Sequence, residues 1–230
     1  MATTQTFSIR PGCRADLPHA VEVFLSAFRK DDLFDILFPN RHTHPHVIRA
    51  QISRLYASRY WSLNYDLRVV AGNDDGRIVG LTWWKRPKAA MSFWERWVSP
   101  YAWIAPLIST WFSIRDWLFP IKDLDKYAGD TFVRAFATVE PALINTPRRE
   151  KAWYLSTLAV DPTVQSKGLG TMLLRDGLER VDQEGNAAWL IALETVEEYY
   201  KKHGFREVGR ANVGELQDWT GGAIMFRNDE

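Results

Sequence analysis

The sequence predicts an α/β fold in which a mixed, twisted sheet is flanked by helices, and three observations support this. Strand and helix patterns alternate along the chain, most regularly after residue 152. Of the 230 residues, 46% are hydrophobic and 25% are charged, which is typical of a folded protein with a substantial core. This length allows one domain with an insertion but hardly two complete cores. We therefore expect a single domain over residues 1–230.

The first strand and the first helix are predicted at the N-terminus. Residues 7–10 form a short strand pattern that Pro11-Gly12 ends. Asp16 is the expected N-cap of the following helix, with Pro18 in its first turn. Apolar residues recur at helical spacing from there to residue 28, so this helix should bury one face.

A second helix and a hairpin are expected before residue 85. The stretch 29–45 is predicted to be irregular, and a helical pattern follows from about residue 47 to 60. The apolar runs 67–70 and 78–81 flank a Gly-Asn-Asp-Asp-Gly sequence, which predicts a β-hairpin.

The character of the sequence changes between about residues 85 and 149, which we interpret as an insertion between the third and fourth strands. Seven of the 11 tryptophans fall between Trp83 and Trp117. Prolines interrupt the segment, so we expect short helices in it rather than one long helix. The uncharged run 97–114 is long enough to cross a membrane, but its two prolines and its serines and threonine argue against a span.

The regular alternation resumes after the insertion. A strand is predicted at 153–160, and a glycine-containing loop, 165–170, leads into a helix with Gly185 as its C-cap. The remaining predicted elements are a strand at 189–194, a short helix through Tyr199 and Tyr200, a strand from Phe205, and a last strand near residues 224–226.

Charge and cysteine content exclude several classes of function. The formal net charge of +1 gives no reason to expect nucleic acid as a partner. The single cysteine, Cys13, forms no internal disulfide and no thiolate metal site, which fits a reducing, cytoplasmic location. The alternating His42, His44 and His46 lack a nearby carboxylate or cysteine to complete a site, so no metal is predicted. The first ten residues carry neither a secretory nor a mitochondrial signal.

The loop at residues 165–170, between the strand predicted at 153–160 and the next helix, has the form of a phosphate-binding site. A helix N-terminus presents unpaired N–H groups at the positive end of the helix dipole, and glycine lets a phosphate approach the backbone. Here the loop is Gln165-Ser166-Lys167-Gly168-Leu169-Gly170. An isolated Gly-x-Gly more often only permits a tight turn, so the interpretation depends on context.

Two spaced motifs supply that context. VDPTVQSKGLGTMLL, residues 160–174, resembles the acetyl-CoA signature Q/R-x-x-G-x-G/A of the GCN5-related N-acetyltransferase (GNAT) superfamily. About thirty residues downstream, YYKKHGF at 199–205 resembles the family's F/L-Y-x-K-x-G-F. The resemblance extends over the chain apart from the insertion and is strongest, in the C-terminal half, to puromycin-type small-molecule acetyltransferases. It implies a GNAT-like twisted sheet and acetyl-CoA as co-substrate.

The resemblance also implies residue roles. The strand before the loop splays from its neighbour in this family, which would free the backbone of Leu158, Ala159 and Val160 to bind the pantetheine arm. The pyrophosphate would be bound by Gln165, Ser166, Lys167, Gly168, Leu169, Gly170 and Thr171. Tyr200 would lie near the thioester sulfur and protonate the leaving thiolate, while the N–H of Leu158 would stabilise the oxyanion. A structural role for Tyr200, as a core aromatic beside Tyr199, is the alternative.

The general base is less directly indicated. Many family members carry an asparagine early in the helix before the tyrosine, where this chain has Leu193-Glu194-Thr195-Val196. Glu194, expected at the end of a strand, is the candidate that deprotonates an incoming ammonium, with an ordinary helix N-terminal carboxylate as the alternative. Glu140 is a weaker candidate for the same role.

The predicted reaction is direct transfer of acetyl from acetyl-CoA to an amine of a small molecule. Two alternatives stay open: acetylation of a peptide N-terminus or lysine, and a catalytically silent CoA-binding interaction module. Acceptor pockets in this family come from the variable N-terminal helices and insertions. We expect the tryptophan-rich insertion to wall such a pocket, with padding of the core or a docking patch for a partner or membrane surface as the alternatives.

Overall fold

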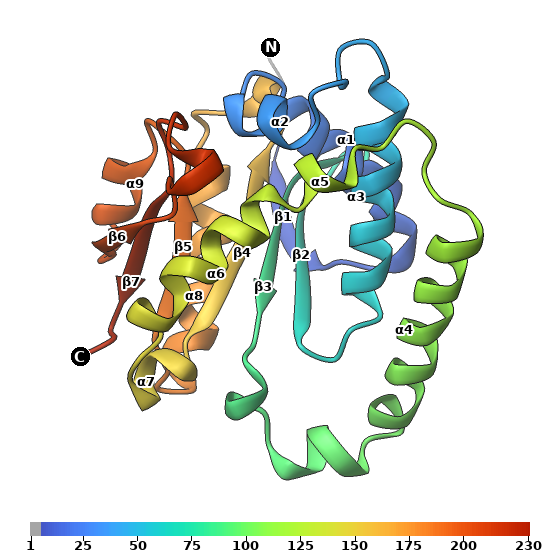
Figure 1. Cartoon of the computed structure of the whole chain (residues 1–230). Coiled ribbons are helices and arrows are strands. Elements are labelled where there is room, and N and C mark those ends of the chain that lie inside the picture. The colour runs from blue at the N-terminus through green and yellow to red at the C-terminus, as the bar shows by residue number, and fades with distance from the viewer. Residues whose placement is uncertain (1–5) are drawn as a thin grey trace, which may run out of the picture.

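A seven-stranded sheet with the order β1-β2-β3-β4-β5-β7-β6 runs through the molecule (Figure 1). The structure, a computed structural model, describes residues 6–230, without the side chains of 95, 96 and 101. Neighbouring strands are antiparallel except β4 and β5, which are parallel. The strands are β1 (Phe7–Pro11), β2 (Tyr65–Gly72), β3 (Ile78–Lys85), β4 (Trp153–Val160), β5 (Ala188–Ala192), β6 (Arg206–Arg210) and β7 (Ala223–Arg227).

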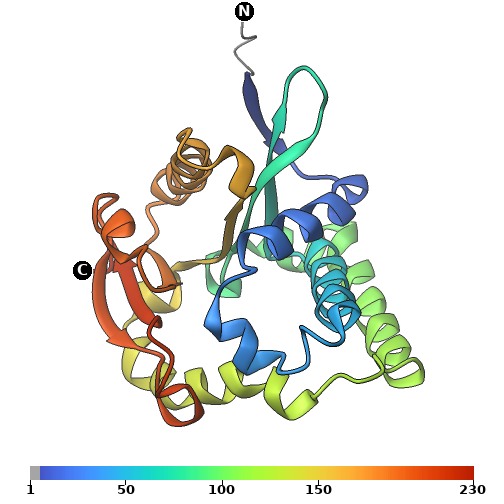
Figure 2. The ribbon, with the colours of Figure 1, turned by 90° about the horizontal axis from the view of Figure 1, so that it is seen from above.

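Helices cover both faces of this sheet. The helices are α1 (Leu17–Ala27), α2 (Asp32–Leu37), α3 (Pro45–Tyr60), α4 (Pro100–Leu118), α5 (Lys126–Gly129), α6 (Thr131–Leu143), α7 (Pro147–Glu150), α8 (Leu169–Gln183) and α9 (Glu197–Lys201). Figure 2 shows α8 on one side of the sheet and α1, α3 and α6 on the other. The predicted mixed α/β fold is therefore confirmed.

The predicted hairpin, the strand at 153–160 and the helix around 47–60 are all present, and Gly185 follows the end of α8 with a φ of 65°. The stretch 29–45, predicted to be irregular, contains α2 instead. Asp31 caps this helix by accepting a hydrogen bond from the N–H of Leu33 at 3.0 Å. Phe34 is buried against Phe24, so a local cap and a tertiary contact together support this short helix.

Asp16 occupies the N-cap position of α1 but does not cap the helix with its side chain. Its carboxylate accepts hydrogen bonds from Arg10 at 2.6 Å and from the N–H of Cys13 at 2.7 Å. The ion pair with Arg10 lowers the pKa of Asp16 to about 2. The carboxylate therefore ties β1 to the start of α1.

The tryptophan-rich segment lies between β3 and β4 as expected, but its structure differs from the prediction. Residues 100–118 form one long helix, α4, with Pro106 inside it. Trp83 and Trp84 are fully buried in β3, whereas five later tryptophans are exposed: Trp94, Trp97, Trp103, Trp111 and Trp117. These five neither pad the core nor cover the sheet. No helix among residues 6–230 combines the length and apolar character that a membrane crossing needs.

Candidate active site

The two parallel strands at the centre of the sheet separate along their length. β4 pairs with β5 at Trp153–Leu155, and the two strands diverge beyond this point in the described chain. The register between β3 and β4 shifts at Trp83/Trp84, which leaves Ser156 as an extra residue in β4. Such a bulge bends a strand and ends pairing, and bulges are common beside active sites. The splay that the family resemblance implied is therefore present.

The register decides which backbone groups face the gap between β4 and β5. The N–H of Asp161 donates to the carbonyl of Val79 at 2.8 Å. Asp161 and Val79, which stand opposite each other on the two strands, are therefore a hydrogen-bonded pair. Hydrogen-bonded and non-hydrogen-bonded pairs alternate in an antiparallel ladder, which directs the backbone of Ala159 toward β3. Leu158 and Val160 therefore direct their backbone groups into the gap. The carbonyl of Val160 accepts a hydrogen bond from Gln165 Nε2 at 3.0 Å.

The loop after β4 presents the N-terminus of α8 to open space. Ser166 and Gly168 both have positive φ, 62° and 79°, and Gly168 occupies the N-cap position without a side-chain cap. A Cβ on Gly168 would meet no atom within 4 Å. Uncapped N–H groups beside an open cradle form the arrangement that binds phosphate.

An open groove of about 430 Å³ runs beside this cradle, between β1 and the exposed side of α8. It is lined by Ile9, Gly168, Thr171, Met172, Arg175, Asp176 and Glu179. Lys167 lies close by, with its Nζ 5.9 Å from the centre of the Phe7 ring. The positive helix end suits a phosphate, and Arg175 and Lys167 add positive charge that the carboxylates of Asp176 and Glu179 partly offset.

Two adjacent tyrosines on α9 lie next to the splayed strand. Tyr200 is buried against Phe205 in a cluster that Leu158 and Tyr199 also contact. Burial raises the pKa of Tyr200, so its phenol stays protonated at neutral pH. The hydroxyl of Tyr199 is buried and lies 3.7 Å from the position of a Cβ on Gly170. Tyr199 is therefore a second candidate that the motif alone did not indicate.

The two candidate bases come from segments other than β4 and α9. Glu194 lies two residues beyond the end of β5, not at the strand end as predicted. It is exposed and accepts a hydrogen bond from the hydroxyl of Thr220 at 2.7 Å. Glu140 is exposed on α6.

Sequence reasoning missed a polar cluster on the opposite face of β4. Arg59 Nη1 of α3 donates to Thr157 Oγ1 at 3.2 Å, and the guanidinium lies 5.1 Å from the centre of the Tyr65 ring. The Tyr56 hydroxyl is buried beside Thr157, and the Trp83 Nε1 is buried there without a hydrogen-bond partner among the described residues. Arg59 and Thr157 are 98 positions apart, so no local pattern joins them. The cluster adjoins Leu158, on the side of the sheet away from α8.

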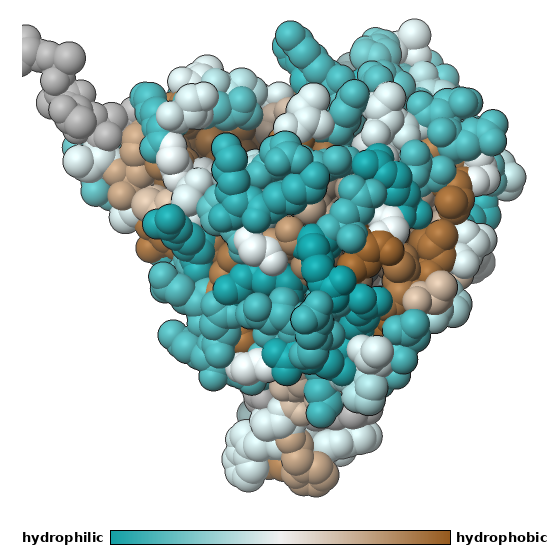
Figure 3. Space-filling model, turned by 90° about the vertical axis from the view of Figure 1, so that its left-hand side faces the viewer, coloured by the Kyte–Doolittle hydropathy of each residue, from teal (hydrophilic) through white to brown (hydrophobic). Residues whose placement is uncertain are grey.

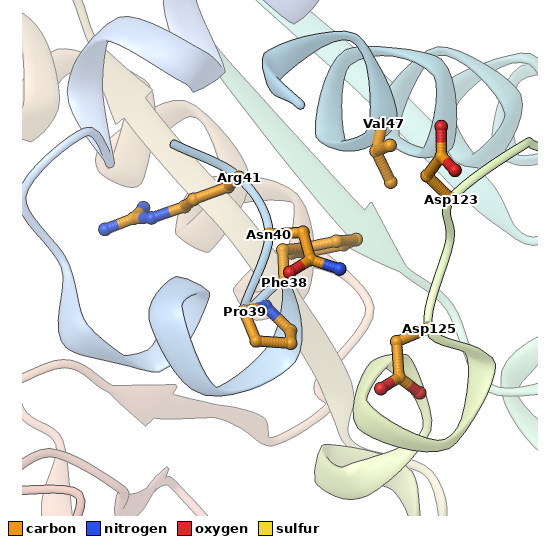
Figure 4. A pocket seen from close by; sticks show the side chains of 7 residues that line it. All are labelled: Phe38, Pro39, Asn40, Arg41, Val47, Asp123 and Asp125. Carbon is orange, nitrogen blue, oxygen red and sulfur yellow. The ribbon is translucent and has the colours of Figure 1, made fainter. Parts of the chain in front are cut away.

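A second hollow, bordered by the stretch 38–41, Val47 of α3, Asp123 and Asp125, is too small to bind a substrate (Figure 4). Its volume is about 10 Å³, which is about the space of one water molecule. In Figure 4 the Arg41 side chain points away from the two carboxylates, and Arg41 Nε pairs with Asp35 at 2.5 Å. This hollow is therefore not a substrate site.

Comparison with known proteins agrees with the geometry. Residues 129–207 match the family model described as the acetyltransferase (GNAT) domain. Over residues 129–207 the chain therefore resembles a GNAT acetyltransferase domain. This domain is that of acetyl-CoA-dependent N-acetyltransferases, which confirms the predicted enzyme class and co-substrate. The match begins at residue 129, inside the segment 85–149, so the family model includes residues 129–149. The interpretation of the whole segment 85–149 as an insertion therefore stays a prediction.

Solved structures share the fold. A histone acetyltransferase HPA2 and related acetyltransferase from Corynebacterium glutamicum has 22% identity and a TM-score of 0.61, with 96% of each chain covered. The PaiA N-acetyltransferase from Thermoplasma acidophilum, in complex with coenzyme A, has 12% identity and a TM-score of 0.53 over 96% of this chain and 98% of that chain. The ribosomal-protein-S18-alanine N-acetyltransferase from Escherichia coli has 15% identity and a TM-score of 0.53 over 96% and 93%. At these identities the likeness concerns the GNAT fold.

Proposed function

We propose that the protein transfers acetyl from acetyl-CoA directly to a primary amine of a small molecule. The observation that carries the proposal is the gap between β4 and β5, which opens beside the uncapped N-terminus of α8. Leu158, at the edge of this gap, packs in the same cluster as the tyrosines of α9. A phosphate cradle, exposed strand backbone and a protonated phenol therefore meet in one place. The related T. acidophilum fold was solved with coenzyme A, which supports the same ligand here.

The residues around the gap fit acetyl-CoA. The N–H groups from Gln165 to Thr171 would hold the pyrophosphate, because Gly168 leaves the approach to α8 open. The backbone of Leu158 and Val160 would pair with the pantetheine arm as a neighbouring strand does. Ala159 would lie between these two residues without binding the pantetheine arm through its own backbone, because that backbone faces β3.

The chemistry would use groups that this arrangement already holds in place. Acetyl-CoA supplies an activated acetyl group and a thiolate leaving group. The N–H of Leu158 would stabilise the negative charge that develops on the acetyl oxygen, and a backbone donor in a strand needs no reorganisation. Tyr200 would give its proton to the departing sulfur, because burial keeps that proton on the phenol at neutral pH.

Glu194 is the proposed base. Its carboxylate is exposed and oriented by Thr220, so it can accept a proton from an ammonium through water. A primary amine is mostly protonated at neutral pH, and its ammonium form has to lose a proton before the nitrogen attacks the thioester carbon. The alternative is that the Glu194 carboxylate only stabilises the N-terminus of α9. In that case replacing Glu194 by glutamine should not lower the turnover number.

We expect the acceptor to bind on the face of the sheet away from α8, which we call the acceptor face. A small acceptor is favoured over a polypeptide because α6 covers this face. Phe136 of α6 stacks on Trp189 of β5 with ring centres 5.4 Å apart, and Phe132 packs on Trp219. α2 contacts α6 and extends this cover. The resemblance of the C-terminal half to puromycin-type acetyltransferases supports the same acceptor class.

The proposal is tested by measuring thiol release from acetyl-CoA across a panel of small amines, small alcohols and peptides. We expect release with at least one class of small primary amine and a product heavier by one acetyl group in mass spectrometry. Release with peptides alone would overturn the small-molecule assignment. Tight CoA binding without release for any acceptor would favour the silent CoA-binding module, and absence of CoA binding would overturn the proposal altogether.

A further inference from the structure

The helix α4 exposes an apolar face that no described part of the protein covers. On a helix of 3.6 residues per turn, six exposed residues fall on one stripe about 100° wide. They are Trp103, Ile104, Leu107, Trp111, Ile114 and Leu118. We call this stripe the outer face of α4; it contains no charged residue.

The opposite side of the helix is also apolar. Ala105, Ile108 and Phe112 are half-buried on the side toward α3, and Arg54 of α3 holds the C-terminal end of α4 through Asp116 at 3.1 Å. The two charged residues of α4, Arg115 and Asp116, pair with each other at 2.6 Å. A helix that is apolar nearly all round is stable in water only when both sides are buried.

The exposed area is that of an interface. Six aromatic side chains on α4 and beside it are 63% to 80% exposed: Phe93, Trp94, Trp103, Trp111, Trp117 and Phe119. Because a large aromatic side chain has about 150–250 Å² of surface, these six expose on the order of 800 Å². The largest apolar patch of a typical monomer is about 300–600 Å². The opposite side of the molecule, in contrast, is mostly hydrophilic (Figure 3).

We propose that the outer face of α4 is the interface of a homodimer, in which it packs against the same face of a second copy. A stable dimer of standard size buries about 800 Å² on each partner. Of the six exposed aromatic residues, Trp103 and Trp111 lie on the outer face, so the proposed interface also includes the flanking Phe93, Trp94, Trp117 and Phe119. A two-fold axis near Trp111 sets Leu107 of one copy against Ile114 of the other. Since the outer face carries no charge, this self-pairing brings no like charges together.

Two properties favour a protein over a membrane surface as the occupant. Helices that lie in a membrane interface carry lysine and arginine along a strongly polar face, and α4 has one arginine that is paired with its neighbour. Tryptophan is enriched among the residues that dominate binding at protein interfaces. Figures 1 and 2 agree that α4 lies at the outer edge of the molecule beyond α3, away from α8, so pairing leaves the cofactor cradle open.

The test is the mass of the full chain in solution, by sedimentation equilibrium, for the wild type and two matched variants. Leu107→Glu puts a charge on the outer face, and Ser109→Glu puts the same charge on an exposed position of α4 outside it. We expect twice the chain mass of 26.6 kDa for the wild type and for Ser109→Glu, and a single chain for Leu107→Glu with unchanged CoA affinity.

A monomeric wild type overturns the proposal, and so does a dimer that Leu107→Glu leaves intact. A monomer that co-sediments with vesicles of phosphatidylcholine and phosphatidylserine assigns the face to a membrane instead. If Leu107→Glu fails to fold, Trp111→Cys in a Cys13→Ser background replaces it. That variant should form a disulfide-linked dimer on oxidation, and a failure to cross-link overturns the two-fold pairing.

Discussion

Replacing Gly168 by alanine separates the binding role of the loop before α8 from its role in the fold. Gly168 has a φ of 79°, and an added Cβ would meet no atom within 4 Å. The substitution therefore clashes with none of the described residues, and its cost to folding is that of the left-handed backbone, about 1–2 kcal/mol. The same Cβ would occupy the space in front of the N-terminus of α8, where the pyrophosphate is proposed to bind.

The expected loss of affinity is larger than the loss of stability. If the Cβ removes two hydrogen bonds from backbone N–H groups to charged phosphate, each worth about 1.5–3 kcal/mol, CoA affinity falls at least about 100-fold. Calorimetric titration with CoA measures the affinity, and urea denaturation measures the free energy of unfolding.

Gly76 provides a matched control, and Gly170 tests the stability of the first turn of α8. Gly76 in the β2–β3 turn has a φ of 65° and open space around it, so Gly76→Ala should lose the same stability and bind CoA as the wild type does. At Gly170, in the first turn of α8, a Cβ would lie 3.7 Å from the Tyr199 hydroxyl, which is ordinary contact. Because alanine is a better helix former, Gly170→Ala should gain up to about 1 kcal/mol. A folded Gly168→Ala protein that binds CoA as tightly as Gly76→Ala does refutes the phosphate-cradle assignment.

Four further substitutions, one of them a control, test the site and the fold. Tyr200→Phe should lower the turnover number roughly 10²–10⁴-fold at unchanged CoA affinity, because it removes the proposed general acid and keeps the ring. Tyr199→Phe, the matched control, should turn over normally in the same assay, and the reverse result would move the acid to Tyr199. Asp16→Asn should destabilise the fold by about 2 kcal/mol at pH 7, since the native pKa of about 2 lies below the value of 3.8 for the free side chain. That stability is present above pH 4 and lost as the pH falls toward 2, so denaturation curves of the two proteins should converge in acid. Gly177→Ala would place a Cβ 2.1 Å from Trp84 Nε1, and we expect a loss of about 1–3 kcal/mol in urea denaturation.

Elements with a strong local pattern could be predicted from the sequence. These elements are β4, α3, the β2–β3 hairpin and the loop before α8. Their signals are periodicity, glycine and proline, all of which act within a few residues. The short helix α2 escaped prediction because it depends on burial of Phe34 against Phe24, a contact that periodicity over six residues cannot reveal.

Contacts between distant segments could not be predicted. Tyr199 approaches Gly170 only because α9 packs beside α8, and the Arg59–Thr157 hydrogen bond joins α3 to β4 across 98 positions. The apolar character of residues 97–114 was evident, but composition does not tell whether an apolar helix turns toward its own core or toward a partner. The exposure of α4 follows from its place beyond α3 at the edge of the molecule (Figure 1).

The bulge in β4 explains how one strand serves both faces of the candidate site. Strict alternation over 153–160 would put Trp153, Leu155 and Thr157 on the same face of the sheet. Trp153 and Leu155 do pack with the apolar residues of α8, but the extra residue at Ser156 reverses the alternation. Thr157 therefore faces Arg59 on the α3 side, while Leu158 contacts the cluster that contains Tyr200. One inserted residue thus separates β4 from β5, directs the Leu158 backbone into the gap and brings a polar side chain to the proposed acceptor face.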